Sequence, residues 1–298
     1  LINVTANDTL FFRTEFKGGE KAADFYNLNL YHTINKENNS VVGIKKSEVN
    51  FKDYLWFINE DESKDNKIIF NKKLTDFSIE KIAMSHKNQR MELMGVLRDS
   101  TYKDLKLLLK NVDLDKITPS VDSLKFEGKV NGLVNFKQNK SIYEPSSAIT
   151  IDSLSINKLA LGDLVIDIKG DNTFKNFKVN SVLKNNGFES FSTEGNVFVE
   201  NKKTILDLGL RLNNFDMAAF SPLGGDIITN IRGLASGTAS FTGELENPNI
   251  VGRLYLSKAG LKIPYINVDY NFKNNAIVDV TENQFSFRNI ELTDTKYN

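Results

Sequence analysis

Cysteine is absent from this 298-residue chain, and histidine occurs only twice. Without a thiol there is no disulfide, no thiolate metal site and no cysteine nucleophile. His32 and His86 lie far apart and have no second histidine nearby, so a metal centre or a histidine-based catalytic site is not expected. The glycine-rich motifs of phosphate and dinucleotide sites and the serine motif of hydrolases are also missing. These absences predict a protein that is not an enzyme and holds neither metal nor cofactor.

Excess charge of one sign is missing as well, because lysine plus arginine and aspartate plus glutamate both number 38. Zero formal net charge argues against nucleic-acid binding, which needs surplus basic side chains to displace counterions. No stretch reaches the ~18 consecutive apolar residues that suggest a membrane-spanning helix. Residues 1–4 already alternate like a strand and resemble no signal peptide. We therefore expect a piece of a longer protein whose membrane anchor lies outside it.

What the chain has in quantity is alternation of apolar and polar residues. Leu206, Leu208 and Leu210, for example, alternate with Asp207 and Gly209. Successive side chains of a strand point to opposite faces, so each such run has one apolar and one polar face. Clusters of Asn, Gly and Lys interrupt the runs as turns do, at 38–40, 185–187, 201–203 and 274–275. The pattern predicts an all-β, antiparallel fold with one apolar face throughout.

Helices are expected to be few and short. Residues 20–28 have the composition of one short helix. Residues 113–117 and 216–220 are predicted to form single turns, since each begins at an aspartate able to cap a helix.

The chain also repeats itself. The segment 109–114 matches 212–217, and Gly128, Gly132 and Phe136 match three residues at constant spacing, Gly233, Gly237 and Phe241. The match predicts three parts: a β-rich N-terminal part over 1–108, a first β-repeat module over 109–211 and a second over 212–298.

The second module carries a resemblance to a known family. The motifs are 233–243 (GLASGTASFTG), 247–256 (NPNIVGRLYL), 259–270 (AGLKIPYINVDY) and 285–294 (FSFRNIELTD). They resemble the C-terminal region of TamB proteins, which belong to the AsmA-like superfamily, and 8–19 (DTLFFRTEFKGG) resembles the Bacteroidetes-type form. The resemblance implies an elongated sheet curled into an open trough, the β-taco. It also implies the periplasm as location, an inner-membrane anchor outside this chain, and an Omp85-type outer-membrane barrel (TamA or a relative) as partner.

The function expected from this resemblance is non-enzymatic transport of phospholipid between the two membranes, linked to assembly or translocation of outer-membrane proteins. A conduit for acyl chains needs a continuous apolar wall. The residues predicted to line this groove share the apolar parity of their strands: Phe126, Val130, Val134, Phe136, Ile149, Ile151, Ile156, Leu206, Leu208, Leu210, Leu254, Leu256, Leu261, Ile263, Ile266, Val268, Phe272, Phe285 and Phe287. The paired glycines on the same parity are expected to permit sharp curl of the sheet or close approach of another backbone.

Alternatives remain open at this point. One is a scaffold or chaperone for outer-membrane protein insertion or secretion without lipid transport, and another is a secreted or outer-membrane β-repeat protein. From periodicity alone, the apolar parity also fits the buried core of a sandwich, solenoid or barrel. Trp56 and Phe57 are expected to pack in a core, the acidic run 60–65 to form a solvated loop, and both histidines to lie at the surface.

Overall fold

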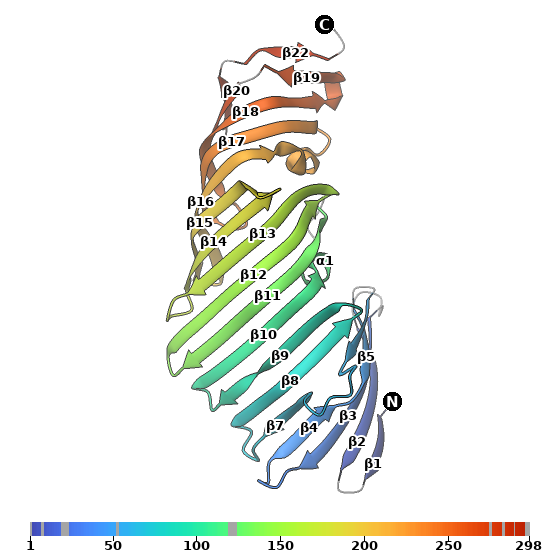
Figure 1. The fold of residues 1–298 in the computed structure, drawn as a ribbon. Coiled ribbons are helices and arrows are strands. Elements are labelled where there is room, and N and C mark those ends of the chain that lie inside the picture. Colours follow the sequence, from blue (N-terminus) through green and yellow to red (C-terminus); the bar gives the residue numbers. More distant parts are fainter. Residues whose placement is uncertain are drawn as a thin grey trace. The chain divides into compact units, whose positions relative to one another are not determined.

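A computed structural model of the chain describes residues 2–6, 9–18, 24–51, 54–118, 124–273, 276–281, 284–288 and 290–295, without the side chains of 2–6, Leu223 and Phe285. Within these ranges, hydrogen bonds join 22 strands into one sheet (Figure 1). The neighbouring strands run antiparallel. The predicted all-β, antiparallel fold is therefore confirmed.

Strands occupy most of the first half of the chain. They are β1 (Ile2–Ala6), β2 (Leu10–Gly18), β3 (Asp24–Ile34), β4 (Ser40–Ile44), β5 (Ser47–Phe51), β6 (Tyr54–Ile58), β7 (Lys67–Phe70), β8 (Asp76–His86), β9 (Gln89–Arg98), β10 (Tyr102–Asp113), β11 (Phe126–Asn139) and β12 (Ile142–Ile156). β1 and β4 to β7 have only four or five residues each, and the others are longer.

The second half continues with long strands and ends with short ones. These are β13 (Leu159–Gly170), β14 (Asn176–Asn185), β15 (Phe188–Glu200), β16 (Lys203–Asp216), β17 (Thr229–Glu244), β18 (Asn249–Ile263), β19 (Val268–Phe272), β20 (Ala276–Thr281), β21 (Gln284–Arg288) and β22 (Leu292–Asp294). The helices are α1 (Leu114–Ile117), η2 (Met217–Gly224) and η3 (Pro264–Ile266).

Two of the three predicted helices are present. α1 and η2 lie where they were expected, and the Asp216 side chain caps η2 by accepting a hydrogen bond from the Ala218 N–H at 2.9 Å. The third prediction, over 20–28, is wrong for its described part, because residues 24–28 begin strand β3. Phe25 and Tyr26 pair there with Lys17 and Phe16 of β2, and this cross-strand pairing overrides a weak local helix preference.

The chain divides into two compact units. Unit 1 consists of Leu1–Lys116, Val130–Ile149 and Asn172–Phe174, and unit 2 of Ile117–Lys129, Thr150–Asp171 and Lys175–Asn298. The three-part division by repeats stays a prediction. The backbone does show a likeness between matched positions, since Asn111 and its match Asn214 both have a left-handed conformation, with φ of 52° and 50°.

Most strands pair with their neighbours in sequence, as in a meander. This holds for β8 to β10 and for β13 to β18. Unit 1 departs from the pattern between β3 and β8, where β3 pairs with both β4 and β5, while β8 pairs with both β6 and β7. Unit 2 departs from it after β18, which pairs with both β19 and β20.

Candidate functional site

The register of unit 2 aligns apolar side chains in rows that cross many strands. Leu164 of β13 lies opposite Leu183, which lies opposite Phe191. The same row then passes through Leu212, Gly237, Leu254, Val278 and Phe287. Because directly paired residues point to the same side of a sheet, these side chains form one surface. We call this side the apolar face of unit 2.

The register of unit 1 produces a second surface of the same kind. Phe12 of β2 pairs with Leu30, which pairs with Ile44 of β4. Farther along, Ile79 pairs with Gly95, which pairs with Leu105. The apolar face of unit 1 contains Leu10, Phe12, Leu28, Leu30, Val42, Ile44, Ile68, Phe70, Phe77, Ile79, Met84, Met91, Leu93, Leu97, Leu105, Leu107 and Leu109.

These faces are only partly covered by other residues of the chain. Among the apolar-parity residues of β16, Leu206 is 5% exposed, while Leu208, Leu210 and Leu212 are half-buried. Phe12, Ile44 and most residues of the unit 1 face are also half-buried. Inward side chains on central strands of a sealed sandwich are close-packed and nearly inaccessible. The apolar faces therefore retain accessible surface.

The predicted lining residues differ in how far they are exposed. Val130 (2%), Leu206 (5%) and Ile151 (6%) are buried, whereas Val134 (36%), Phe287 (49%) and Ile266 (50%) are exposed. The side chain of Phe285 lies outside the described residues. The remaining lining residues are half-buried: Phe126, Phe136, Ile149, Ile156, Leu208, Leu210, Leu254, Leu256, Leu261, Ile263, Val268 and Phe272.

Ile266 does not lie on a strand. It was expected to alternate with Val268, but Pro264 ends β18 and the turn η3 carries Tyr265 and Ile266. Proline lacks the N–H that continued strand pairing needs. Tyr265 is consequently 95% exposed.

The sequence prediction named no lining residue before Phe126, so it missed the part of the unit 1 face that lies on β2 to β10. The period of two is present there, for example at Leu28 and Leu30. It is harder to follow because β4 to β7 have only four or five residues each, and because a register shift between Ile79 and Ile82 moves the alternation by one residue.

Glycines on the apolar parity bring neighbouring backbones together. Gly132 and Gly237 have φ of 144° and 149°. A Cβ atom at Gly132 would overlap the carbonyl oxygen of Ala148, and one at Gly237 would overlap that of Arg253. The predicted close approach of a second backbone is therefore present at both matched positions, and such a position favours bending of the sheet.

The short helices cover the ends of the strands. Phe215 at the end of β16 is 5% exposed and stacks on Phe220 of η2, with ring centroids 5.5 Å apart. In unit 1, α1 follows β10 and buries Leu114 to 7%. Each apolar face is thus covered locally at one of its strand ends.

No family model matches this chain. No curated protein and no solved structure matches it either. The structure therefore supplies the fold and the two faces, and the TamB-like resemblance stays a prediction. In the described part of the chain, no helix is both long and apolar enough to cross a membrane.

The opposite, polar side of the sheet carries ion pairs between neighbouring strands. Arg253 of β18 contacts Asp279 of β20 at 2.6 Å, and Arg288 of β21 contacts the same carboxylate at 2.7 Å. The hydrogen bond from Arg253 holds the pKa of Asp279 below its ordinary value. Lys178 and Glu194 form a similar pair across β14 and β15. These charged pairs suit a side of the sheet that faces water.

Among the described residues, no group of three or more His, Asp or Glu side chains is placed to hold a metal ion. His86 is not a plain surface residue, because its ring stacks on Tyr54 at 4.3 Å and its Nδ1 lies 2.7 Å from the Leu55 carbonyl oxygen. Trp56 is 1% exposed, so its expected core packing is confirmed, whereas Phe57 is only half-buried.

Tyr54 joins this cluster to the end of β10 and has an altered pKa. Its hydroxyl donates to Asp113 Oδ2 at 2.8 Å, and Gln89 Nε2 donates to the same oxygen at 2.9 Å. The hydrogen bond to Asp113, together with burial, raises the pKa of Tyr54 from 10.0 to about 12.

We expect this shift to make stability pH-dependent only in strong alkali. Since the folded-state pKa lies above the ordinary value of 10.0, the bond stabilises the fold fully below pH 10 and is lost as the pH rises through about 12. The phenolate absorbance lost in Tyr54→Phe reports the titration of this residue. Asp113→Asn should move its midpoint down toward 10. A midpoint near 10 in the unmodified chain would contradict the Tyr54–Asp113 bond.

Proposed function

We propose that this chain is a non-enzymatic conduit segment whose apolar faces bind phospholipid acyl chains in the periplasm. The observation that carries the proposal is the partial exposure of apolar rows that run across many consecutive strands, as in the row from Leu164 to Phe287. A soluble chain gains nothing from leaving such a surface to water, so a bound apolar ligand accounts for it best.

The magnitudes suit an acyl chain. Each buried methylene contributes about 0.8 kcal/mol, so a chain of about 16 carbons gains on the order of 10 kcal/mol on transfer from water. Eight strands spaced by about 4.8 Å make the row in unit 2 roughly 34 Å long. This exceeds the reach of one acyl chain, since two opposed chains fill the ~30 Å hydrocarbon core of a bilayer.

The resemblance to TamB proteins supplies the cellular part of the proposal. It suggests a longer, inner-membrane-anchored protein that reaches an Omp85-type outer-membrane barrel, and a link to assembly of outer-membrane proteins. We infer that the curl expected of a β-taco is favoured by Gly132 and Gly237, which let adjacent strands approach closely on the apolar side.

The test is photocrosslinking from two neighbouring positions of β16. A benzoyl-phenylalanine at Leu208 lies on the apolar face, and the same residue at Asp207 lies on the polar side of the same strand. Irradiation in bacteria, followed by mass spectrometry, should show phospholipid attached at position 208 and not at 207. Equal labelling at both positions, or no lipid at either, would rule out the conduit.

A further inference from the structure

The sheet of unit 1 is interrupted beside β4. Two short strands, β4 and β5, lie along β3, with Lys45 and Lys46 between them. Strands β6 and β7 lie along β5 and β4, and the eight-residue loop 59–66 separates them. An interruption on both strands costs backbone pairing, so its geometry needs other support.

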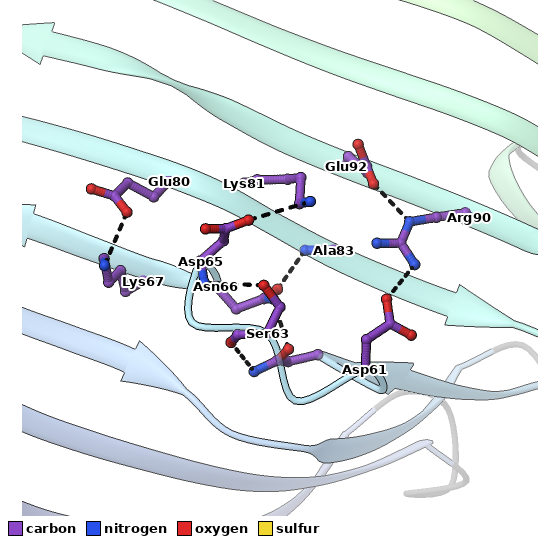
Figure 2. A network of polar contacts seen from close by, with 11 residues as sticks. Asp61, Ser63, Asp65, Asn66, Lys67, Glu80, Lys81, Ala83, Arg90 and Glu92 are labelled. Carbon is purple, nitrogen blue, oxygen red and sulfur yellow. Dashed lines mark hydrogen bonds and ion pairs between the residues drawn. The ribbon is translucent and has the colours of Figure 1, made fainter.

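Buried side-chain amides hold the gap in place. Asn59 and Asn66 are 5% and 3% exposed. Asn59 Nδ2 donates to the Ile44 carbonyl at 2.7 Å and to the Ser63 carbonyl at 3.1 Å. Asn66 Nδ2 donates to Asn59 Oδ1 at 2.8 Å, and Asn66 Oδ1 accepts from the Ala83 N–H at 2.7 Å (Figure 2). A buried network with these partners makes the loop rigid.

Two acidic side chains of the loop, Asp61 and Asp65, are engaged on the side of β8 and β9. Asp65 pairs with Lys81 at 3.3 Å, and Asp61 pairs with Arg90 at 3.1 Å (Figure 2). Arg90 also contacts Glu92 at 2.7 Å. The carboxylates at positions 61 and 65 are therefore directed toward cations of the neighbouring strands.

A cavity of about 590 Å³ lies on the other side of the loop. Its polar-side lining includes Phe11, Arg13, Tyr31, Lys45, Lys46 and Lys64. Phe11, Arg13 and Tyr31 share the polar parity of β2 and β3. The lining also includes Phe12, Leu30 and Ile44 of the apolar face, because the cavity lies where the sheet is interrupted. The volume falls in the usual range of small-molecule sites.

Three lysines, Lys45, Lys46 and Lys64, line this cavity. In the described part of the chain, no carboxylate pairs with Lys45, Lys46 or Lys64. Lys45 Nζ lies 4.2 Å from the centre of the Phe11 ring, and Lys46 Nζ lies 5.5 Å from that of Phe57. Arg13 pairs with Glu15, and Glu62 is the one acidic residue in the lining. The cavity thus combines surplus positive charge with aromatic walls.

We propose that this cavity binds a phosphorylated sugar, either free or as the headgroup of a lipid. The three ammonium groups supply charge for the phosphate, which lysine binds as a point charge. The exposed Phe11 ring and the Tyr31 ring supply flat apolar walls for a sugar, and the Asn29 amide lies in the same lining. The acyl-chain proposal is tested at Leu208 of unit 2, which does not line this cavity, so each proposal can fail without the other.

Calorimetric titration of the full chain tests the proposal. Glucose 6-phosphate is compared with glucose and with inorganic phosphate, and vesicles carrying phosphatidylinositol 4-phosphate are compared with pure phosphatidylcholine. Binding of the soluble sugar phosphate indicates a free ligand, and binding of the vesicles alone indicates a headgroup. The proposal is overturned if neither glucose 6-phosphate nor the phosphoinositide vesicles bind saturably. Its sugar part is overturned if inorganic phosphate binds with the same affinity as glucose 6-phosphate.

A matched pair of variants assigns any binding to the cavity. Lys45→Gln/Lys46→Gln/Lys64→Gln should weaken it by at least about tenfold, since it removes three charges from one ligand site. Lys72→Gln/Lys73→Gln/Lys87→Gln removes the same charge from exposed turns of unit 1 and should leave binding unchanged. Equal losses in both triple variants would refute the site. Lys64→Gln alone, in the exposed loop, replaces the first variant if that does not fold.

Discussion

Leu208→Asp should leave the chain folded and abolish its lipid binding. Leu208 is on the apolar face of unit 2 and is half-buried by its own chain. A carboxylate there stays partly hydrated in the empty protein, so we expect a loss of about 1–2 kcal/mol in the free energy of unfolding. In the lipid-bound protein the same carboxylate would contact an acyl chain, which offers it no hydrogen-bond partner. Lipid binding to this variant is therefore strongly unfavourable.

Leu206→Asp is the matched comparison on the same strand and the same face. Leu206 is 5% exposed, so its replacement buries a charge within protein. We expect a loss of about 4 kcal/mol or more, which is a large fraction of the total stability of a domain. Urea unfolding of both variants measures the two costs, and mass spectrometry of extracted lipid measures loading.

An open apolar face and a sealed sandwich core predict opposite results for these two variants. If the apolar rows were the sealed core of a sandwich, Leu208→Asp would cost as much stability as Leu206→Asp. If the face is open, the two costs differ by at least about 2 kcal/mol and only Leu208→Asp yields a folded, lipid-free protein. A variant that folds and still carries lipid would contradict the assignment of Leu208 to the binding face.

Local alternation was sufficient to predict the strands and their faces in much of this chain. On β16, the period of two identifies Leu206, Leu208 and Leu210 as one face, and the register confirms it. The helix-capping signal was sufficient to predict η2, since the Asp216 side chain accepts a hydrogen bond from the backbone N–H of Ala218. Both signals depend on residues within one turn or one strand, which is why they can be found without a structure.

Features that depend on distant partners could not be predicted. Residues 24–28 become a strand only because β2 pairs with them, and Ile266 leaves the face because Pro264 ends β18. The burial of Asn59 and Asn66 depends on contacts with Ile44 and Ala83, so the acidic loop was recognised only as a solvated segment. The degree of exposure along the apolar face is likewise a property of packing, which a period cannot report.

Curvature of the sheet is the remaining step between an apolar face and a groove, and Gly237→Ala should show how it is specified. Gly237 has φ of 149°, and an added Cβ would overlap the Arg253 carbonyl oxygen on β18. An alanine at this φ would strain the backbone, and its Cβ would also force β17 to shift away from β18. We expect the free energy of unfolding to fall by about 3 kcal/mol.

Gly209→Ala is the control, because Gly209 lies on β16 of the same unit and its added Cβ would have as its nearest contact the Glu194 carbonyl oxygen at an ordinary 3.5 Å. Its free energy of unfolding should change by less than about 1 kcal/mol. Gly132→Ala, at the matched position of the first module, should repeat the large loss seen at Gly237. Equal and small effects at all three positions would mean that the glycines are incidental, and that strand twist alone would have to specify any curvature of the sheet.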